Sequence, residues 1–441
     1  MALTVSPEGP GDRPPRAGRV LALLFAINLL NYIDRYVLAG VLPLLEQAFP
    51  GITKQRLGWL APAFLVIYML TSPVFGYLGD RTPRRLLVGL GVQLWSLATA
   101  ASGLARGFWQ LFVSRMFVGV GEAAYGTCAP TIISDLYPRA ARGRVLTLFY
   151  VAIPLGSALG YLLGGMIGTH GSWRAAFWVV GLPGLLVGLA AYWMYEPTRG
   201  ASEEVDPGEL QRFLKRKLQL RDYLDLLRTR SLVLNTLGMT AYTYAIGGIS
   251  FWMPTFLNQE RDLPLGRASF QFGAITAATG IVGTMLGGFV ADRLARRVPG
   301  AYFLVCGVSM LLAVPAFYVV LLSTDPAVYW PALAMAELLL FINTGPSNTI
   351  LVNVTLPDVR TTALALNIFV IHALGDVLSP VVMGATADRS NLTTAFLYTG
   401  GVVLLGGLLW AAGTPFLGRD SDRVRERMQR QANQRGTAPP T

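Results

Sequence analysis

Two stretches of ten residues decide the fold: Gly76-Tyr-Leu-Gly-Asp80-Arg81-Thr-Pro-Arg84-Arg85 and Gly288-Phe-Val-Ala-Asp292-Arg293-Leu-Ala-Arg296-Arg297. They carry the same glycine, aspartate, arginine and arginine pair at matching positions, 212 residues apart, and each follows a long apolar run. Matched motifs of this kind indicate an internal repeat in which each copy belongs to one half of the chain. We expect each glycine to permit close helix approach, each aspartate to cap a facing helix, and the arginines to lie at headgroup level.

The composition indicates a membrane protein. Of 441 residues, 53% are hydrophobic and 14% charged, whereas soluble domains carry about 25% charged residues. Mean hydropathy is +0.48. These values argue against a soluble enzyme and a nucleic-acid binder, although the net charge is +11. The two cysteines, Cys128 and Cys306, lie in apolar runs and predict neither a disulfide framework nor a metal site.

The apolar runs are long enough to cross a bilayer as helices, which takes about 20 residues. Eight of them lack charged residues: Leu57–Gly79, Leu86–Ala105, Val145–Trp173, Ala175–Tyr195, Ser231–Gln259, Ala268–Ala291, Val298–Thr324 and Ser390–Gly418. Four more contain charges: Val20–Leu45, Phe108–Pro130, Ala327–Val354 and Thr361–Ala387. The sequence therefore predicts an all-α membrane protein with twelve transmembrane helices, numbered here in chain order. A transmembrane β-barrel would need shorter, alternating segments.

The hydrophilic connection 196–230 divides the chain into six-helix bundles at 20–195 and 231–418. We expect 1–19 and 419–441 to be disordered, and Leu210–Leu227 to form either an amphipathic helix on the membrane surface or a solvated linker helix. With both termini cytoplasmic, 27 Lys and Arg lie on the inside and 7 on the outside. The positive-inside rule therefore predicts cytoplasmic N- and C-termini.

These features resemble the major facilitator superfamily, and the resemblance covers all twelve spans. Further matches are Arg115-Met-Phe-Val-Gly-Val-Gly-Glu122-Ala123, the small-residue run Gly156–Gly165 and Glu196-Pro-Thr-Arg199. Three motifs look like the Spinster subfamily: Asn31–Gly40, Gly119-Val-Gly-Glu122-Ala123 in helix 4, and His372–Pro380. This resemblance implies two halves rocking about a central site, a cytoplasmic gate at the two repeated motifs, and export of lysophospholipids or sphingosine phosphate, driven by protons in bacterial members. The short termini and the absence of a targeting signal suit a bacterial inner membrane.

Charged residues inside a span cost roughly 2.5 to 3.5 kcal/mol each, so each is a functional candidate. The six are Asp34, Arg35, Arg115, Glu122, Glu337 and Asp376. From the helical rise, Asp34 lies about 21 Å and Arg115 about 22 Å from the cytoplasmic end of its span, so the two could pair. Glu122 is two turns from Arg115 on the same helix face. We expect Asp34 or Glu122 to carry the proton, and Arg35 and Arg115 to act as counter-ion and headgroup binder. The alternative is permanent ion pairs that fix helix packing.

Other polar and aromatic residues admit two interpretations each. His372 could relay protons or serve only as a packing residue. Asp376 and Glu337 could belong to a charge switch or form structural contacts. Tyr242, Tyr244, Phe251 and Trp252 could form a wall for an acyl chain or belong to the core. Asn343 could line the cavity or bond helix to helix. Pro254 and Pro346 are expected to interrupt helices 7 and 10.

The sequence thus predicts a monomeric secondary active transporter without cofactor or metal, energised by a proton gradient. Its partners would be protons, the lipid bilayer and a small amphipathic anion. The first alternative is a transporter of a drug, sugar or organic acid, and the second is a receptor that does not transport. No nucleotide-binding loop, metal-ligand cluster or nucleophile elbow indicates an ATP-driven pump or an enzyme.

Overall fold

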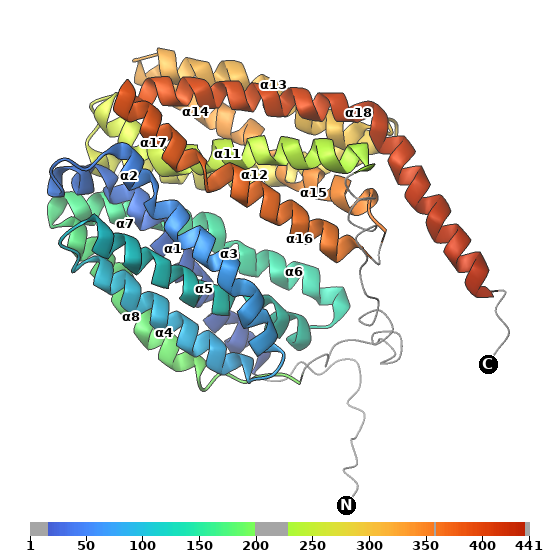
Figure 1. The fold of residues 1–441 in the computed structure, drawn as a ribbon, viewed down its shortest axis with the longest axis horizontal. Coiled ribbons are helices and arrows are strands. Elements are labelled where there is room, and N and C mark those ends of the chain that lie inside the picture. Colours follow the sequence, from blue (N-terminus) through green and yellow to red (C-terminus); the bar gives the residue numbers. More distant parts are fainter. Residues whose placement is uncertain (1–15, 199–227, 357–358, 437–441) are drawn as a thin grey trace, which may run out of the picture.

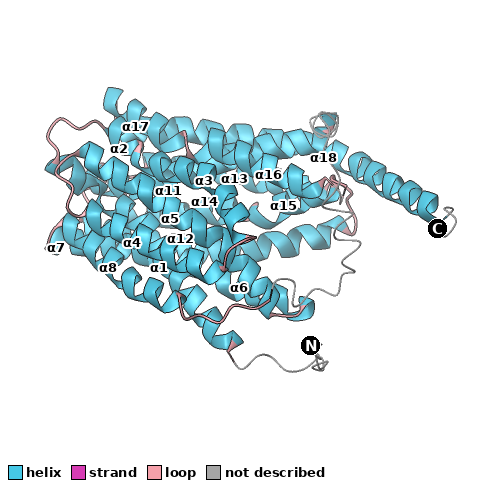
Figure 2. Cartoon of the chain, turned by 60° about the horizontal axis from the view of Figure 1, so that its bottom comes forward, coloured by secondary structure: helices cyan, strands magenta, loops and turns pink. Residues whose placement is uncertain are grey.

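The computed structural model describes residues 16–198, 228–356 and 359–436, and every regular element in them is a helix (Figures 1 and 2). The first half contains α1 (Ala17–Ala48), α2 (Lys54–Gly58), α3 (Leu60–Gly79), α4 (Arg84–Ser102), α5 (Phe108–Leu136), α6 (Arg139–Tyr150), α7 (Ala152–His170) and α8 (Trp173–Ala191). The second contains α11 (Arg230–Gln259), α12 (Leu265–Ala295), α13 (Ala301–Leu322), α14 (Pro326–Phe341), α15 (Thr344–Asn353), α16 (Arg360–Ile371), a π turn η1 (His372–Asp376), α17 (Ser379–Arg389) and α18 (Leu392–Gly436). The predicted helix over Leu210–Leu227 lies outside the described residues.

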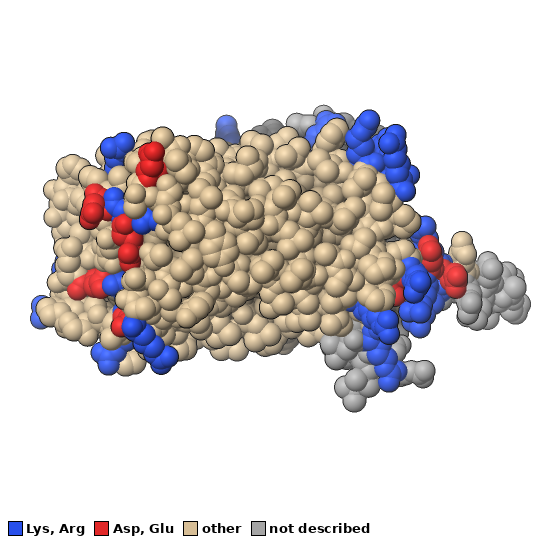
Figure 3. All heavy atoms as spheres, turned by 90° about the horizontal axis from the view of Figure 1, so that it is seen from above, with Lys and Arg blue, Asp and Glu red and all other residues tan. Residues whose placement is uncertain are grey.

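Several consecutive elements continue into one another: α2 into α3, α6 into α7, α14 into α15, and α16 through η1 into α17. The elements therefore form twelve rods, which run roughly side by side. Nine of the rods are long and apolar enough to cross a membrane. The other three, α4, α5 and α11, have spanning length but are more polar. On the face in Figure 3, a broad band almost free of charged residues separates two charged ends, as expected for a protein embedded in a bilayer. The described chain thus has a helical rod at each of the twelve predicted positions, and nine of these rods are apolar enough to span a membrane.

Prolines break some rods and leave others intact. The rod α14–α15 breaks at Ile342–Asn343 because Pro346 cannot donate to the carbonyl of Ile342. By contrast, α11 runs through Pro254, so the predicted interruption of helix 7 is wrong. The carbonyl that Pro254 leaves without its helical donor is that of Ser250, and the Tyr161 hydroxyl from the other half donates to it at 2.6 Å. A partner from outside the helix thus replaces the missing hydrogen bond.

The prediction of a disordered tail over 419–441 is also wrong for most of that segment, since α18 continues to Gly436. Asp420 accepts a hydrogen bond from the backbone nitrogen of Ser231 at 3.0 Å, which ties this part of α18 to the start of α11. Arg423 pairs with Asp420 one turn away, and Arg425 with Asp422. These local pairs and residues of high helix propensity favour the helix where the apolar span has ended.

The start of α1 and the last turns of α18 lie at the same end of the bundle, here called the terminus end (Figure 1). The short helix α2 lies at the opposite end, here called the far end. The two halves meet along α7 and α12, where Gly273 packs on Ala158 and the rings of Tyr161 and Phe272 lie 5.0 Å apart. Small residues allow this approach because an added Cβ on Gly273 would be only 3.2 Å from the backbone of Ala158.

Candidate functional site

A cavity of about 210 Å³ lies between the two halves. From the first half it is lined by Arg35, Tyr36, Leu38, Ala39, Ala61, Phe64, Leu65 and Arg115, and from the second by Thr243, Ile246, Gly247, Ser250, Phe251, His372, Asp376 and Pro380. Its walls are largely apolar and aromatic. The polar groups are divided, with two guanidinium groups on one wall and an imidazole with a carboxylate on the other. Such a cavity suits a molecule with an apolar body and a charged head.

Two ion pairs lie on the first-half wall. Arg115 donates to both oxygens of Asp34, at 3.3 and 3.4 Å, and both residues are 1% exposed. Arg35 donates to one oxygen of Glu122 through two nitrogens, at 2.6 and 2.7 Å. The predicted pairing of Asp34 with Arg115 is confirmed. Asp34 and Arg35 take different partners because adjacent residues on a helix are turned by about 100° from one another.

Arg35 is the more accessible of the two cations, with a side chain 24% exposed, whereas the side chain of Glu122 is 0% exposed. The guanidinium group of Arg35 also lies 4.7 Å from the ring of Phe64 and 4.9 Å from that of Tyr32. It is therefore held between a carboxylate behind it and aromatic rings beside it, with the cavity in front. An arginine in this position can face a bound anion without leaving its protein partners.

Two buried polar atoms of these pairs have no hydrogen-bond partner within the described part of the chain. They are Oε1 of Glu122 and Nε of Arg115. Unsatisfied buried groups are costly and often mark functional sites. Here one belongs to a carboxylate and one to a guanidinium group that the sequence singles out.

The second-half wall carries the pair His372 and Asp376, whose Nδ1 and carboxylate oxygens are 2.9 Å apart. Both side chains are partly exposed. They lie on the π turn η1, which forms where Pro380 lacks the nitrogen donor that would bond the carbonyl of Asp376. The turn was not predicted. It places the carboxylate of Asp376 across the cavity from the guanidinium group of Arg35. His372 and Asp376 therefore belong to the lining of the cavity, which the sequence did not indicate.

Other predicted site residues lie away from the cavity. Glu337 accepts hydrogen bonds from Thr276 at 3.0 Å and Thr279 at 3.2 Å, and so joins α14 to α12. Asn343 accepts one from Ser309 on α13 at 3.0 Å. Both are buried and absent from the lining, so their expected contribution to substrate binding is not supported by their positions.

The expected aromatic wall is reduced to one member in the second half. Phe251 lines the cavity. Trp252 is 0% exposed and donates to the carbonyl of Pro380 at 2.9 Å, which makes it a core residue. Tyr242 lies 3.4 Å from the Thr344 hydroxyl, and neither it nor Tyr244 is among the lining residues.

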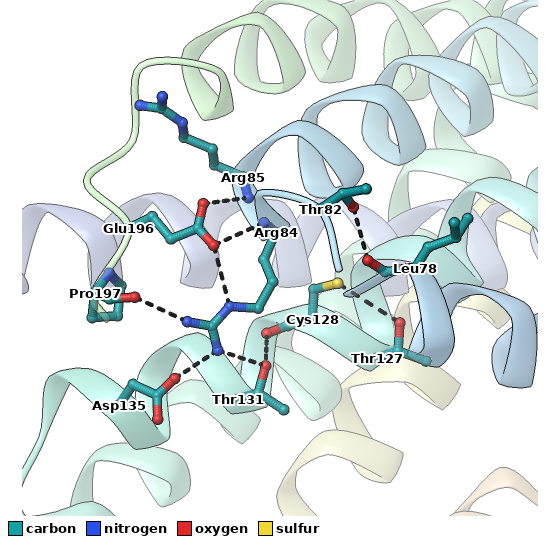
Figure 4. Close-up of polar contacts among 10 residues, drawn as sticks. All are labelled: Leu78, Thr82, Arg84, Arg85, Thr127, Cys128, Thr131, Asp135, Glu196 and Pro197. Carbon is teal, nitrogen blue, oxygen red and sulfur yellow. Dashed lines mark hydrogen bonds and ion pairs between the residues drawn. The ribbon is translucent and has the colours of Figure 1, made fainter. Parts of the chain in front are cut away.

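The two copies of the repeated motif have different surroundings. Arg84 is buried and bonds Asp135 at 2.6 Å, Glu196 at 3.4 Å and the carbonyl of Pro197 at 3.1 Å (Figure 4). Arg85 donates its backbone nitrogen to Glu196, and Arg81 stacks on Tyr77 at 3.6 Å. The first copy thus forms a network between α4, α5 and the segment after α8.

In the second copy, Asp292 accepts a hydrogen bond from the Tyr302 hydroxyl at 2.9 Å, and Arg293, Arg296 and Arg297 are exposed. The expectation for the motif glycines is wrong, since a Cβ on Gly76 or Gly288 would meet nothing within 4 Å. The neighbouring Gly287 makes the close approach instead, against the carbonyl of Ile342.

A polar cluster joins the halves at the far end. Both carboxylate oxygens of Asp388 on α17 accept backbone hydrogen bonds from the first turn of α2, from Lys54 at 2.7 Å and Gln55 at 2.8 Å. Glu46 bonds the side chains of Lys54 at 2.7 Å and Gln259 at 2.8 Å. These partners are up to 334 residues apart, and no sequence signal indicates them. The cavity is therefore closed at the far end by contacts between the halves.

A twelve-helix bundle of two six-helix halves with a charged cavity between them is typical of membrane transporters, and a family model supports that class: residues 24–380 match the Major Facilitator Superfamily. The chain belongs to this family. Within it the chain is of the spinster type, since it is 40% identical to protein spinster homolog 3 of Danio rerio, over 83% of this chain and 76% of that one. It is 34% identical to the sphingosine-1-phosphate transporter SPNS2 of Mus musculus, over 94% and 79%. The fold also matches a crystal structure of a bacterial homolog of the human lysosomal transporter Spinster in an inward-facing, unoccupied conformation, with a TM-score of 0.78, 22% identity and coverage of 94% and 99%.

Proposed function

We propose that this spinster-type transporter exports an amphipathic anion in exchange for protons. The observation that carries the proposal is the position of Arg35, held by the fully buried carboxylate of Glu122 on one side and open to the cavity on the other. A cation that is already neutralised has little attraction left for a second anion. The state of Glu122 therefore governs how strongly Arg35 attracts a bound headgroup.

The coupling follows from this geometry. When a proton binds Glu122, the carboxyl becomes neutral and its attraction for the guanidinium group falls, so Arg35 can bind a phosphate by two hydrogen bonds. When the proton leaves, the carboxylate reclaims Arg35 and the phosphate is released. Protonation of Asp34 would weaken its attraction for Arg115 in the same way. Deeper burial of this second pair makes Arg115 less accessible to substrate than Arg35.

The cavity supports a lipid-like substrate. Phe64, Phe251 and the aliphatic lining residues offer an apolar surface for an acyl chain, and the guanidinium groups offer sites for a phosphate. The pair of His372 and Asp376 on the opposite wall could accept a hydrogen bond from a hydroxyl or an ammonium group. A lysophospholipid or a sphingoid phosphate has these parts, and the name of the mouse relative points to the same class.

Alternating access would open the two ends in turn. The contacts of Asp388 and Glu46 close the far end in this structure, and we place the terminus end in the cytoplasm because most Lys and Arg lie there. The structure would then represent a state closed to the outside. We further propose that a single chain is the working unit, since the cavity lies between its own two halves.

Proton flux in proteoliposomes tests the proposal. Wild-type protein, Glu122→Gln, Asp34→Asn and Arg35→Ala are compared after adding a lysophospholipid or a sphingoid phosphate, with Asp325→Asn as the control. Asp325 caps the first turn of α14 and is exposed, away from the cavity.

We expect the lipid to evoke proton flux in wild type and control, and the flux to be lost in Glu122→Gln and Arg35→Ala. Loss in Asp34→Asn with retention in Glu122→Gln would move the proton site to the other pair. Flux evoked by a drug, sugar or organic acid but by no lipid would reject the substrate class, and flux retained in all variants would reject the coupling.

A further inference from the structure

A second basic site lies at the terminus end of α12, outside the central cavity. A hollow of about 460 Å³ is lined by Phe289, Val290, Arg293, Leu294, Arg296 and Arg297. Phe289 is 67% exposed, and the three arginines are exposed as well. Three guanidinium groups beside an apolar surface form a site for an anion that also carries an apolar part.

The arginines are free to bind such an anion because this copy of the repeat lacks the network of the first copy. There, Arg84 is occupied by Asp135 and Glu196 (Figure 4). The residues 212 positions after those two acids are Ser347 and Leu408, which cannot form an ion pair. Among the residues that the structure describes, none forms an ion pair or a hydrogen bond with the side chains of Arg293, Arg296 or Arg297.

An exposed apolar stripe leads from the hollow along α12. Val282, Met285, Leu286, Phe289 and Val290 are 39 to 72% exposed and recur every three or four residues, which places them on one side of the helix. From Val282 to Arg293 the helix rises about 16 Å, or roughly half the hydrocarbon thickness of a bilayer. The stripe thus has the length of the acyl chains of one leaflet, and the arginines lie where that leaflet has its headgroups.

We propose that this arginine hollow binds a bilayer phospholipid with a net negative headgroup, whose phosphate contacts the three guanidinium groups and whose acyl chain follows the exposed stripe of α12. The site is independent of the transport cavity. A soluble phosphate shares the headgroup chemistry but gains nothing from the stripe, and a zwitterionic lipid would bring an additional positive charge to the arginines.

Native mass spectrometry of the full-length, delipidated protein in detergent tests this site, with phosphatidylglycerol titrated against wild type and two triple variants. The first is Arg293→Gln/Arg296→Gln/Arg297→Gln. The matched control, Arg423→Gln/Arg425→Gln/Arg427→Gln, removes the same charge from exposed positions of α18 near the same end. Since a basic residue near an anionic surface contributes about 1 kcal/mol, we expect on the order of 100-fold weaker binding in the first variant, and a change under about twofold in the control.

Three further arms separate the occupants. Met285→Ser/Phe289→Ser removes part of the stripe while keeping the arginines, and should also weaken phosphatidylglycerol binding. Inorganic phosphate at millimolar concentration should not displace the lipid, and phosphatidylcholine should bind at least about tenfold more weakly. Equal loss in both triple variants, no loss in either, displacement by phosphate, or equal binding of phosphatidylcholine would each overturn the proposal.

Discussion

Replacing Arg115 with glutamine should destabilise the folded protein at neutral pH because Asp34, 1% exposed, loses its cation. Removing one partner of a buried pair typically costs about 3 to 5 kcal/mol. The variant can avoid the buried charge by binding a proton to Asp34. With an unperturbed aspartate pKa of about 3.9, that protonation costs about 4 kcal/mol at pH 7 and about 1.5 kcal/mol at pH 5. The loss of stability is therefore limited to about 4 kcal/mol and shrinks as the pH falls.

The sign of this pH dependence follows from proton binding. In Arg115→Gln the folded state binds a proton that the unfolded state releases at neutral pH, so stability decreases as the pH rises from 5 to 7. In Asp34→Asn the remaining charge is a guanidinium that stays protonated, so the cost should not change over that range. The double variant Asp34→Asn/Arg115→Gln has no buried charge and should lie within about 1 kcal/mol of wild type.

Equilibrium unfolding in mixed micelles of a mild detergent and dodecyl sulfate, at pH 5 and pH 7, measures these differences. A double-mutant cycle should give a coupling energy of about 5 to 9 kcal/mol at pH 7, because each single variant leaves one buried charge unpaired and the double variant leaves none. The reasoning would be refuted by a double variant as unstable as the sum of the single ones, or by an Arg115→Gln effect that is the same at both pH values.

Three further outcomes are expected. Glu337→Gln should retain substrate-evoked proton flux in proteoliposomes, because Glu337 bonds two threonines away from the cavity; loss of flux in correctly folded protein would return it to the site. Asp388→Ala removes both hydrogen bonds that cap the first turn of α2. A lost cap costs about 1 kcal/mol, so the population open at the far end should increase by about fivefold. Labelling of an introduced cysteine from the outside measures that shift, because the two native cysteines are buried and give little background. Unchanged labelling would contradict a closing role for Asp388. Arg84→Gln should cost about 3 kcal/mol of stability and Arg296→Gln less than about 0.5 kcal/mol, and equal melting temperatures would contradict the asymmetry of the repeat.

Much of the site could be predicted from the sequence because a charge inside an apolar span is rare and costly. That rule found Asp34, Arg35, Arg115 and Glu122, and counting helical rise predicted that the first and third of these could pair. The same rule selected Glu337, which is buried but bonds hydroxyl groups between α14 and α12. A charge in a span indicates a polar environment, and it does not tell whether that environment is a cavity or a helix contact.

Tertiary contacts account for the residues that the sequence misplaced. Pro254 and Pro380 look alike in the sequence, since each lacks a backbone donor. The carbonyl left by Pro254 is satisfied by Tyr161 from the other half, and α11 stays continuous. At Pro380 the helix instead forms the π turn that brings His372 and Asp376 to the cavity. The tail offers a similar case, because Asp420 reaches the start of α11.

From composition, helix length and spacing along one chain, the sequence predicts the membrane environment, the twelve helices and the internal repeat. It also determined which charges are expensive. Packing of the helices in three dimensions sets which charges meet, leaves Arg296 exposed while Arg84 is occupied, and lets Asp388 cap a helix 334 residues away. Identical motifs acquire different partners because hydrogen bonds and ion pairs act over about 3 Å in space, while sequence periodicity reports only neighbours on the same helix.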